Sequence, residues 1–286
     1  MSVDLWRRPS GMSEAAAGQA ARLRGLPADA AALARIVQGL LIHMHIASSY
    51  GVSLTPQQQA QAHRRSASEI LSGITSQDGR DLAEARPAAE RVVGVCRHFT
   101  LLHVAMLRSH GIPARARCGF ATYFESGRFL DHWVTEYRDP VRDRWVLADA
   151  QLDDHQRQLF RIAFDPIDVP RDQFLVAGEA WHLCRTGKAD PGVFGILDMY
   201  GLWFIADNVI RDVAALNNHE MLPWDVWGAM SGRHSDIDQA LIDRLAGLSR
   251  APDLDVADLQ KAYRDPRVAV PSSVFNALLD RPEAVR

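Results

Sequence analysis

Three residues in the middle of the sequence could together carry out nucleophilic catalysis: Cys96, His132 and Asp149. A cysteine thiolate attacks a carbonyl carbon, and an imidazole takes the thiol proton and later donates one to the leaving group. A carboxylate at the second ring nitrogen fixes the tautomer of that imidazole. We therefore predict acyl-transfer chemistry, provided that the surrounding elements bring the three side chains together.

The cysteine stands at the predicted start of a helix. Residues 96–109 (CRHFTLLHVAMLRS) are rich in helix-forming types, and a Gly-Ile-Pro sequence soon after them stops the helix. The unpaired N–H groups and the dipole at this end of a helix stabilise a thiolate. The backbone N–H of Cys96 is then a natural donor to an oxyanion, and Trp133 and Gln151 are candidates for a second donor.

The pattern after this helix predicts an antiparallel meander. Polar and apolar residues alternate over 114–124, 129–138 and 144–150, and turn-forming residues separate these stretches. A helix followed by such a meander is typical of the α+β class.

Ideal element lengths allow the three residues to be placed relative to one another. A helix that descends from Cys96 and a strand that climbs back return the chain to the level of the cysteine near Phe120. The first turn then places Phe120 opposite Trp133, and the second places His132 opposite Asp149 or the residue after it. A register shift of one residue would put His132 and Asp149 on opposite faces.

Residues 90–152 also contain three motifs in a specific order: GVCRHFTLLHVAMLRSHGIPARARCGF, DHWVTEY and RWVLADAQLD. Together they resemble the core of the transglutaminase-like superfamily of papain-type thiol enzymes. This resemblance implies Cys96 as the nucleophile, His132 as the base and Asp149 as the residue that orients the histidine.

The motifs depart from the family pattern at two places. Thr100 stands where many members carry alanine, and Ala150-Gln151 stands where Pro-Thr is common. Further along, GLWFIADNVIRDVAALNNHEMLPWDVWG resembles a stretch of bacterial transglutaminase-domain proteins of unassigned function. The resemblance therefore implies the triad without naming a substrate.

We predict a single α+β domain with a papain/transglutaminase-like core. It comprises a helical N-terminal portion (1–90), a catalytic core (91–165) and a helical C-terminal portion (166–286). Helices are expected within 29–48, 57–70, 193–218, 236–249, 253–263 and 272–280.

The composition is that of a globular protein, with 47% hydrophobic and 23% charged residues in a chain of 286. A formal net charge of −3 offers no basic excess for phosphate binding, so we expect no nucleic acid partner. Asp198 and Asp207 interrupt the apolar stretch 193–210, whereas a membrane span needs ~20 mostly apolar residues. We expect no membrane association, and no secretory signal is visible at the N-terminus.

The histidines and cysteines show no metal-ligand pattern. His98 and His103 are five residues apart on one predicted helix, and His43 and His45 point to different sides of another. The cysteines are too few and too far apart for a disulfide framework or a zinc quartet, and they favour a reducing cytoplasm. They are Cys96, Cys118 and Cys184. We expect neither a metal nor a cofactor.

Polar residues in the apolar C-terminal region need partners if they are buried. We expect mainly helix caps and internal ion pairs, with a substrate pocket as the alternative. The residues concerned are Asn208, Arg211, Asp212, Asn217, His219 and Glu220. Arg115 and Arg117 could pair with carboxylates or recognise an acidic substrate, and we expect Arg115 to serve the fold.

The predicted function is that of a cysteine-dependent hydrolase or acyltransferase acting on a small-molecule or peptide amide, ester or thioester. The acyl group would pass through a thioester on Cys96. An alternative is a binding or scaffold protein that keeps the fold without activity. A third possibility is an arylamine-type acyltransferase with a coenzyme A thioester donor, although its cysteine context differs from GVCRHF.

Overall fold

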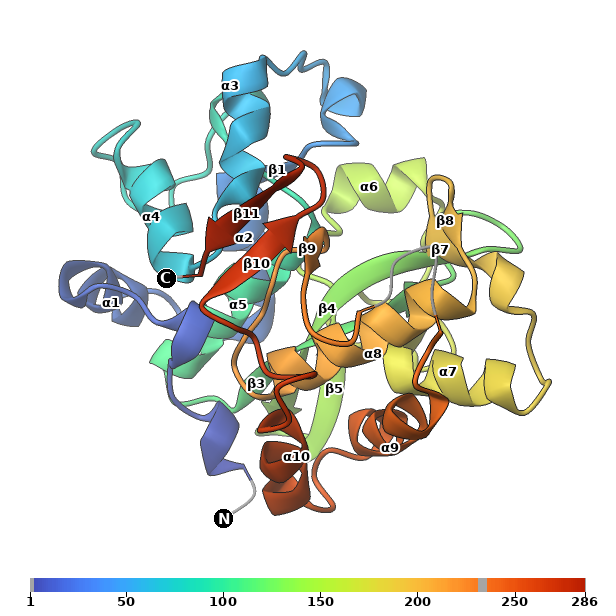
Figure 1. The fold of residues 1–286 in the computed structure, drawn as a ribbon. Helices are drawn as coiled ribbons and strands as arrows, with labels where there is room; N and C mark the ends of the chain where they lie inside the picture. Colours follow the sequence, from blue (N-terminus) through green and yellow to red (C-terminus); the bar gives the residue numbers. More distant parts are fainter. Residues whose placement is uncertain (1–2, 231–235, 286) are drawn as a thin grey trace. The chain divides into compact units, whose positions relative to one another are not determined.

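The computed structural model describes residues 3–230 and 236–285 and has a mixed α+β fold (Figure 1). The chain forms two compact units. The first, here called the α5 unit, comprises Val3–Ala116 and Val134–Val169. The second, the α8 unit, comprises Arg117–Trp133 and Pro170–Arg286 within the described residues.

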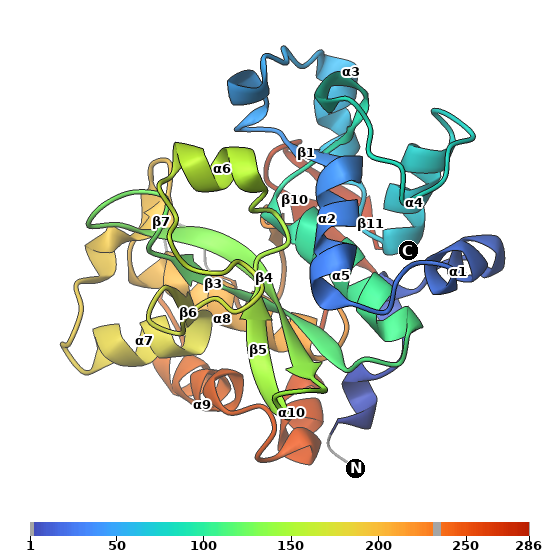
Figure 2. The ribbon, with the colours of Figure 1, turned by 180° about the vertical axis from the view of Figure 1, so that it is seen from behind.

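Helices dominate the first half of the α5 unit. Its central helix is α5 (Cys96–Ser109), in which every residue except the last is buried. The helices α2 and α4 pack against α5, and α2 runs alongside it in Figure 2. The elements before α5 are η1 (Asp4–Trp6), η2 (Gly11–Ser13), α1 (Ala17–Arg24), α2 (Ala30–Leu40), β1 (Leu41–His43), η3 (Ala47–Tyr50), α3 (Pro56–Gln59), η4 (Ala60–His63), α4 (Ala67–Thr75), η5 (Ala88–Glu90) and β2 (Val92–Gly94).

Two predicted helices in this half are shorter than expected. The helix expected over 29–48 ends at Leu40, because Leu41–His43 forms a parallel strand pair with β2. His43 and His45 therefore do not lie on a helix. The helix expected over 57–70 is broken into α3, η4 and α4, since Ser66 caps a new helix by accepting the N–H of Glu69.

The predicted meander is confirmed. It consists of β3 (Ala114–Ala121), β4 (Phe129–Asp139) and β5 (Arg144–Ala148), and α6 (Asp154–Leu159) follows it. These strands belong to a six-stranded sheet in the order β6-β3-β4-β7-β8, with β5 paired to β4. The boundary between the two units crosses β3 after Ala116 and β4 after Trp133.

The predicted register of the meander is wrong by two residues in the first hairpin and by one or two in the second. The Arg138 N–H donates to the Pro113 carbonyl at 2.8 Å, which places these two residues opposite each other. In the second hairpin Thr135 pairs with Ala148, and one more step would place Asp149 opposite Val134 instead of His132.

Both shifts have a local cause. Seven residues, instead of four, connect β3 to β4. In the second turn the Asp139 carboxylate accepts the N–H groups of Val141 and Arg142, and Asp139 pairs with Arg144 to close a loop over 140–143.

The α8 unit surrounds α8 (Leu202–Leu216), which is buried from Phe204 onward. The helices α7 and α9 pack against α8 and against each other. The other elements of this unit are β6 (Phe174–Val176), α7 (Ala177–Arg185), η6 (Pro191–Val193), β7 (Phe194–Ile196), β8 (Met199–Tyr200), β9 (Asp225–Val226), α9 (Gln239–Arg250), α10 (Val256–Tyr263), β10 (Ser273–Asn276) and β11 (Arg281–Ala284).

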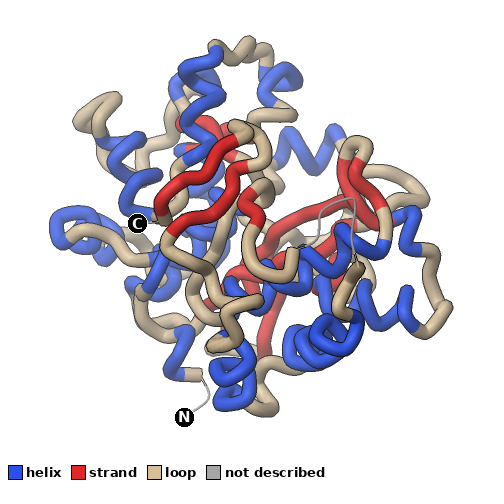
Figure 3. The backbone as a smooth tube through the Cα atoms, viewed as in Figure 1, coloured by secondary structure: helices blue, strands red, loops and turns tan. Residues whose placement is uncertain are grey.

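The helix predicted over 272–280 is wrong. Residues Ser273–Asn276 form β10, which pairs with both β9 and β11 in a separate three-stranded sheet (Figure 3). Buried and exposed residues alternate along β10, as expected for a strand with one covered face.

Across residues 3–230 and 236–285, none of the helices is long and apolar enough to cross a lipid bilayer.

Candidate active site

Cys96 is the first residue of α5, as predicted, and the segment before it is fixed by a strand pair. Strand β2 pairs with β1 so that Gly94 lies beside His43, and the Met44 N–H donates to the Gly94 carbonyl at 2.9 Å. A side chain at Gly94 would come within 2.8 Å of the His98 Cβ atom, so this approach requires glycine. The strand pair thus sets where the helix begins.

Two polar side chains in the first turn of α5 hold its start. His98 Nδ1 accepts the Val95 N–H at 3.2 Å, and Arg97 donates to the backbone carbonyls of Arg64 and Arg65. Burial lowers the pKa of His98 to about 3, so this imidazole is neutral at pH 7. His98 is therefore a structural acceptor at the helix start.

A second buried histidine joins the middle of α5 to β4. His103 Nε2 lies 3.0 Å from the Ala30 carbonyl, and Nδ1 lies 3.1 Å from the Thr135 hydroxyl. Burial lowers the pKa of His103 to about 4, although the Asp149 charge acts in the opposite direction. Both predicted non-metal histidines of α5, His98 and His103, thus have structural contacts.

Asp149 follows β5 directly and is 1% exposed. Its Oδ1 accepts the Gln151 N–H at 3.0 Å, and its own N–H donates to the Pro166 carbonyl at 2.7 Å. These backbone bonds fix the carboxylate at the end of the strand.

A chain of hydrogen bonds continues from Gln151 to Tyr50. The Gln151 amide donates to Gln156 Oε1 at 2.9 Å, and the Gln156 amide donates to the Tyr50 hydroxyl at 3.0 Å. Tyr50 in turn donates to the Asp153 carboxylate at 2.8 Å. This network occupies one N–H of Gln151, which weakens the case for Gln151 as a second oxyanion donor.

His132 lies on β4, is 2% exposed and is surrounded by aromatic rings. The centroids of Phe124, Tyr123 and Phe174 lie 4.9, 5.9 and 6.4 Å from that of the imidazole. All three rings meet it at steep angles. Trp133 has a buried indole N–H without a hydrogen-bond partner, but it points to the opposite face of β4 from His132.

The residue before His132 belongs to a polar network with α8. The Asn208 amide donates to Asp131 Oδ1 at 2.8 Å, and Arg211 donates to Asn208 Oδ1 at 3.1 Å and to the Asp225 carbonyl at 3.2 Å. Burial raises the pKa of Asp131, against the charge of Arg211.

The structure therefore places Cys96 and Asp149 in the α5 unit and His132 on the part of β4 that belongs to the α8 unit. The triad remains a prediction from the sequence. The aromatic surroundings of His132 were not predicted. The only signal in the sequence is that two of the rings, Tyr123 and Phe124, lie close after β3.

The two buried arginines on β3 have structural partners. Arg115 donates to Glu136 at 2.8 Å, and its guanidinium lies 4.4 and 3.9 Å from the ring centroids of Trp6 and Trp145. Arg117 donates to both carboxylate oxygens of Asp212 and to the Ser249 carbonyl. Neither arginine is placed to recognise an acidic substrate, and Asp212 serves the internal ion pair expected for the C-terminal polar residues.

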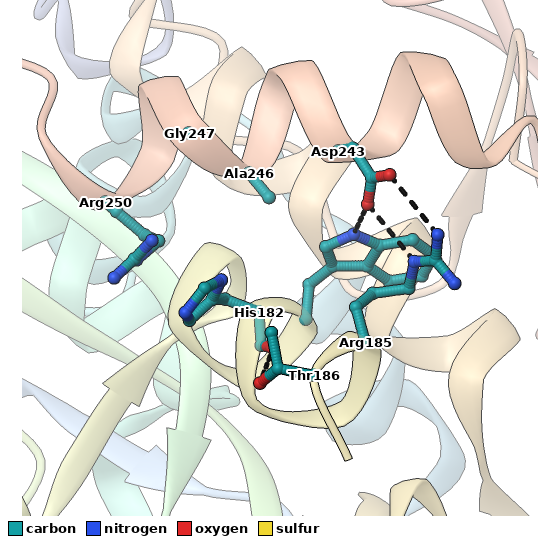
Figure 4. Close-up of a pocket in the computed structure, with 8 residues that line it drawn as sticks. His182, Arg185, Thr186, Asp243, Ala246, Gly247 and Arg250 are labelled. Atoms are coloured by element: carbon teal, nitrogen blue, oxygen red, sulfur yellow. Dashed lines mark hydrogen bonds and ion pairs between the residues drawn. The ribbon is translucent and has the colours of Figure 1, made fainter. Parts of the chain in front are cut away.

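A cavity of about 260 Å³ lies between α7 and α9 (Figure 4). Its charged side chains are paired, since Asp243 accepts from Arg185 at 3.2 Å and Glu179 accepts from Arg250 at 2.6 Å. None of the predicted catalytic residues lines this cavity. No group of three or more potential metal ligands occurs among the residues that the structure describes.

Comparisons with known proteins identify one family to which part of the chain is similar. Residues 47–150 match the family model of the transglutaminase-like superfamily. Among solved structures, a protein from Cytophaga hutchinsonii named a "putative cysteine protease" aligns with 51% of this chain at 20% identity and a TM-score of 0.30. The alignment covers 40% of that protein. A search of curated proteins found no match.

Proposed function

We propose that this transglutaminase-like protein, whose residues 47–150 match the family model, is a thiol-dependent acyl-transfer enzyme. Cys96 is the nucleophile, His132 is the base, and Asp149 orients the base. The observation that carries the proposal is the position of Cys96. It is the first residue of a buried 14-residue helix whose start is fixed by a strand pair. The N–H groups of such a terminus favour an attacking thiolate and a developing oxyanion.

The proposed reaction has two balanced halves. Cys96 Sγ bonds to the carbonyl carbon while His132 accepts the thiol proton, and the bond to the leaving group breaks as His132 returns that proton to it. Water or an amine then attacks the thioester, loses its proton to His132, and releases Cys96, which regains the proton. Water makes the enzyme an amidase or peptidase, whereas an amine makes it an acyltransferase.

The fixed carboxylate of Asp149 supports the role of an orienting residue. Two backbone hydrogen bonds hold its position, so it can direct an imidazole without moving during the reaction.

Thiol labelling tests the proposal before any substrate is known. The protein contains its own control, because burial raises the pKa of Cys184 to about 11 and makes it a poor nucleophile near neutral pH. At pH 6, iodoacetamide should alkylate Cys96 at least roughly tenfold faster than Cys184, as measured by peptide mass spectrometry over time.

The substitution His132→Ala should slow alkylation of Cys96 at pH 6 and leave Cys184 unchanged. Equal rates for the two cysteines in the wild-type protein, or no effect of His132→Ala, would contradict the proposed roles. Circular dichroism of each variant establishes that it is folded.

A further inference from the structure

The rings around His132 differ in their accessibility. Phe174, on β6, is 1% exposed, whereas Tyr123 and Phe124 are only half-buried. The centroids of these two rings lie 4.6 Å apart, so they form a continuous apolar surface with an open side. An apolar surface next to a reactive imidazole is a natural place for a substrate group.

The connection between β3 and β4 holds this surface in place. The Thr122 N–H donates to the Gln173 carbonyl at 3.0 Å, and its hydroxyl donates to the same residue. This anchors the start of the connection to the residue before Phe174.

The charged end of the same connection is engaged elsewhere. Arg128 donates to the Gly192 carbonyl at 3.1 Å, and its guanidinium lies 4.9 Å from the centroid of Tyr200. The cation of this connection is thus bound to η6 and β8, and the side chains next to the imidazole are the aromatic rings of Tyr123 and Phe124.

We propose that Tyr123 and Phe124 form a specificity subsite that accepts an aromatic or branched aliphatic group beside the scissile carbonyl. This rests on the proposed function, because the reaction requires that carbonyl to lie within reach of His132. A group attached to it then meets the rings that pack against the imidazole. Charged or small groups leave the ring surface uncovered and lose this contact.

The size of the expected preference follows from how strongly apolar pockets discriminate between related substrates. Contact with an apolar pocket typically changes the reactivity of related substrates by a factor of about 10 to 200. Since the two rings are partly exposed and do not enclose a group on all sides, we expect the lower end, roughly tenfold.

The test compares two electrophiles of the same reactivity class, iodoacetamide and N-benzyl iodoacetamide. The measured quantity is the ratio of their second-order rate constants at Cys96, from peptide mass spectrometry of the full-length protein. Wild type should favour the benzyl compound about tenfold. The variants Tyr123→Ala and Phe124→Ala should lower this ratio towards that of the free thiol glutathione.

Two further variants distinguish the loss of the ring contact from a nonspecific effect of substitution on the structure. Phe124→Leu keeps an apolar side chain and should retain most of the preference. Leu197→Ala is the matched control, because Leu197 is 73% exposed and lies on the β7–β8 turn, so the ratio should stay at the wild-type value.

The outcomes distinguish the two proposals. A wild-type ratio equal to that of glutathione, with Cys96 still activated at pH 6, overturns the subsite and leaves the proposed function intact. A preference that survives in the double variant Tyr123→Ala/Phe124→Ala also overturns the subsite. Failure of Cys96 to react faster than Cys184 with either compound overturns the proposed function and the subsite together.

Discussion

The surroundings of Cys96 and of His132 are built in different ways. Backbone pairing fixes the cysteine, because β1 and β2 define where α5 starts and the first turn is closed by the Val95 N–H and His98. Side-chain rings surround the histidine, and two of them come from a connection between strands. Substitution can therefore change the surroundings of the proposed base more easily than the position of the proposed nucleophile. We therefore expect substitutions of the rings to change the proposed substrate preference and to leave the start of α5 in place.

Each unit also contains a buried arginine on β3, and the two arginines have different partners. Arg115 of the α5 unit contacts a carboxylate and two indole rings, whereas Arg117 of the α8 unit contacts Asp212 and the Ser249 carbonyl. Asp212 also accepts the Cys118 N–H at 2.8 Å and the Ser249 hydroxyl at 2.6 Å. One carboxylate thus joins β3, α8 and α9.

Removal of Asp212 should have the largest effect on stability. Asp212→Ala removes the carboxylate that pairs with the buried Arg117 guanidinium, and breaking a buried ion pair in this way typically costs about 3–5 kcal/mol of unfolding free energy. Urea denaturation followed by circular dichroism measures the loss. Asp258, the exposed partner of Arg244, is the matched control, and Asp258→Ala should cost less than about 1 kcal/mol.

The equivalent change in the α5 unit sharpens the comparison. Glu136→Ala also removes the carboxylate from a buried arginine, but Arg115 keeps its cation–π contacts with Trp6 and Trp145. The loss of unfolding free energy should therefore be smaller than for Asp212→Ala. If Glu136→Ala lost as much unfolding free energy as Asp212→Ala or more, the ring contacts of Arg115 would not compensate for its carboxylate.

The two regions should also respond to acid with opposite signs. The pKa values of His98 and His103 are lowered to about 3 and about 4 in the folded state, against 6.5 when unfolded. Between pH 6.5 and about 4 the unfolded chain therefore binds more protons, so stability falls as the pH falls. Each histidine contributes a loss of up to about 1.4 kcal/mol per pH unit.

Near the proposed base, His132, the pH dependence of the unfolding free energy has the opposite sign. Because burial raises the pKa of Asp131, this group stabilises the fold below its unfolded value of 3.8 and loses that contribution as the pH rises.

Unfolding free energies at pH 5 and 7 should show a shallower pH dependence for His103→Gln than for wild type. Asp131→Asn should leave the acid loss between pH 6.5 and 4 in place, and a loss removed by Asp131→Asn would contradict this assignment.

The sequence determined the elements that depend on local signals. The bounds of α5 and the three strands of the meander were predictable from helix formers, a Gly-Ile-Pro stop and alternation over 114–148. The strand Leu41–His43 was not, because an apolar run reads equally as helix or as buried strand and its pairing with β2 is a distant contact. The predicted register of the meander was wrong because the turn residues do not reveal how many residues connect β3 to β4 and β4 to β5.

The candidate site was predictable to the same extent. The types and order of Cys96, His132 and Asp149 are visible in the sequence. The ring of Phe174 against His132 depends on pairing between β3 and β6, which are more than fifty residues apart. The partner of Arg117 lies further still along the chain, so no local pattern could identify it.

The central claim is that Cys96 forms an acyl-enzyme, and intact-protein mass spectrometry tests it most directly. Wild type, Cys96→Ala and His132→Ala are mixed with a panel of activated amides, esters and thioesters, with and without an added amine. The account predicts a mass increase equal to one acyl group in wild type, none in Cys96→Ala, and formation slower by a factor on the order of 10³ in His132→Ala. Loss of the adduct on adding amine identifies a transferase, and loss in water alone identifies a hydrolase. An acyl adduct of equal yield in Cys96→Ala, or none in wild type with any member of the panel, would contradict the account.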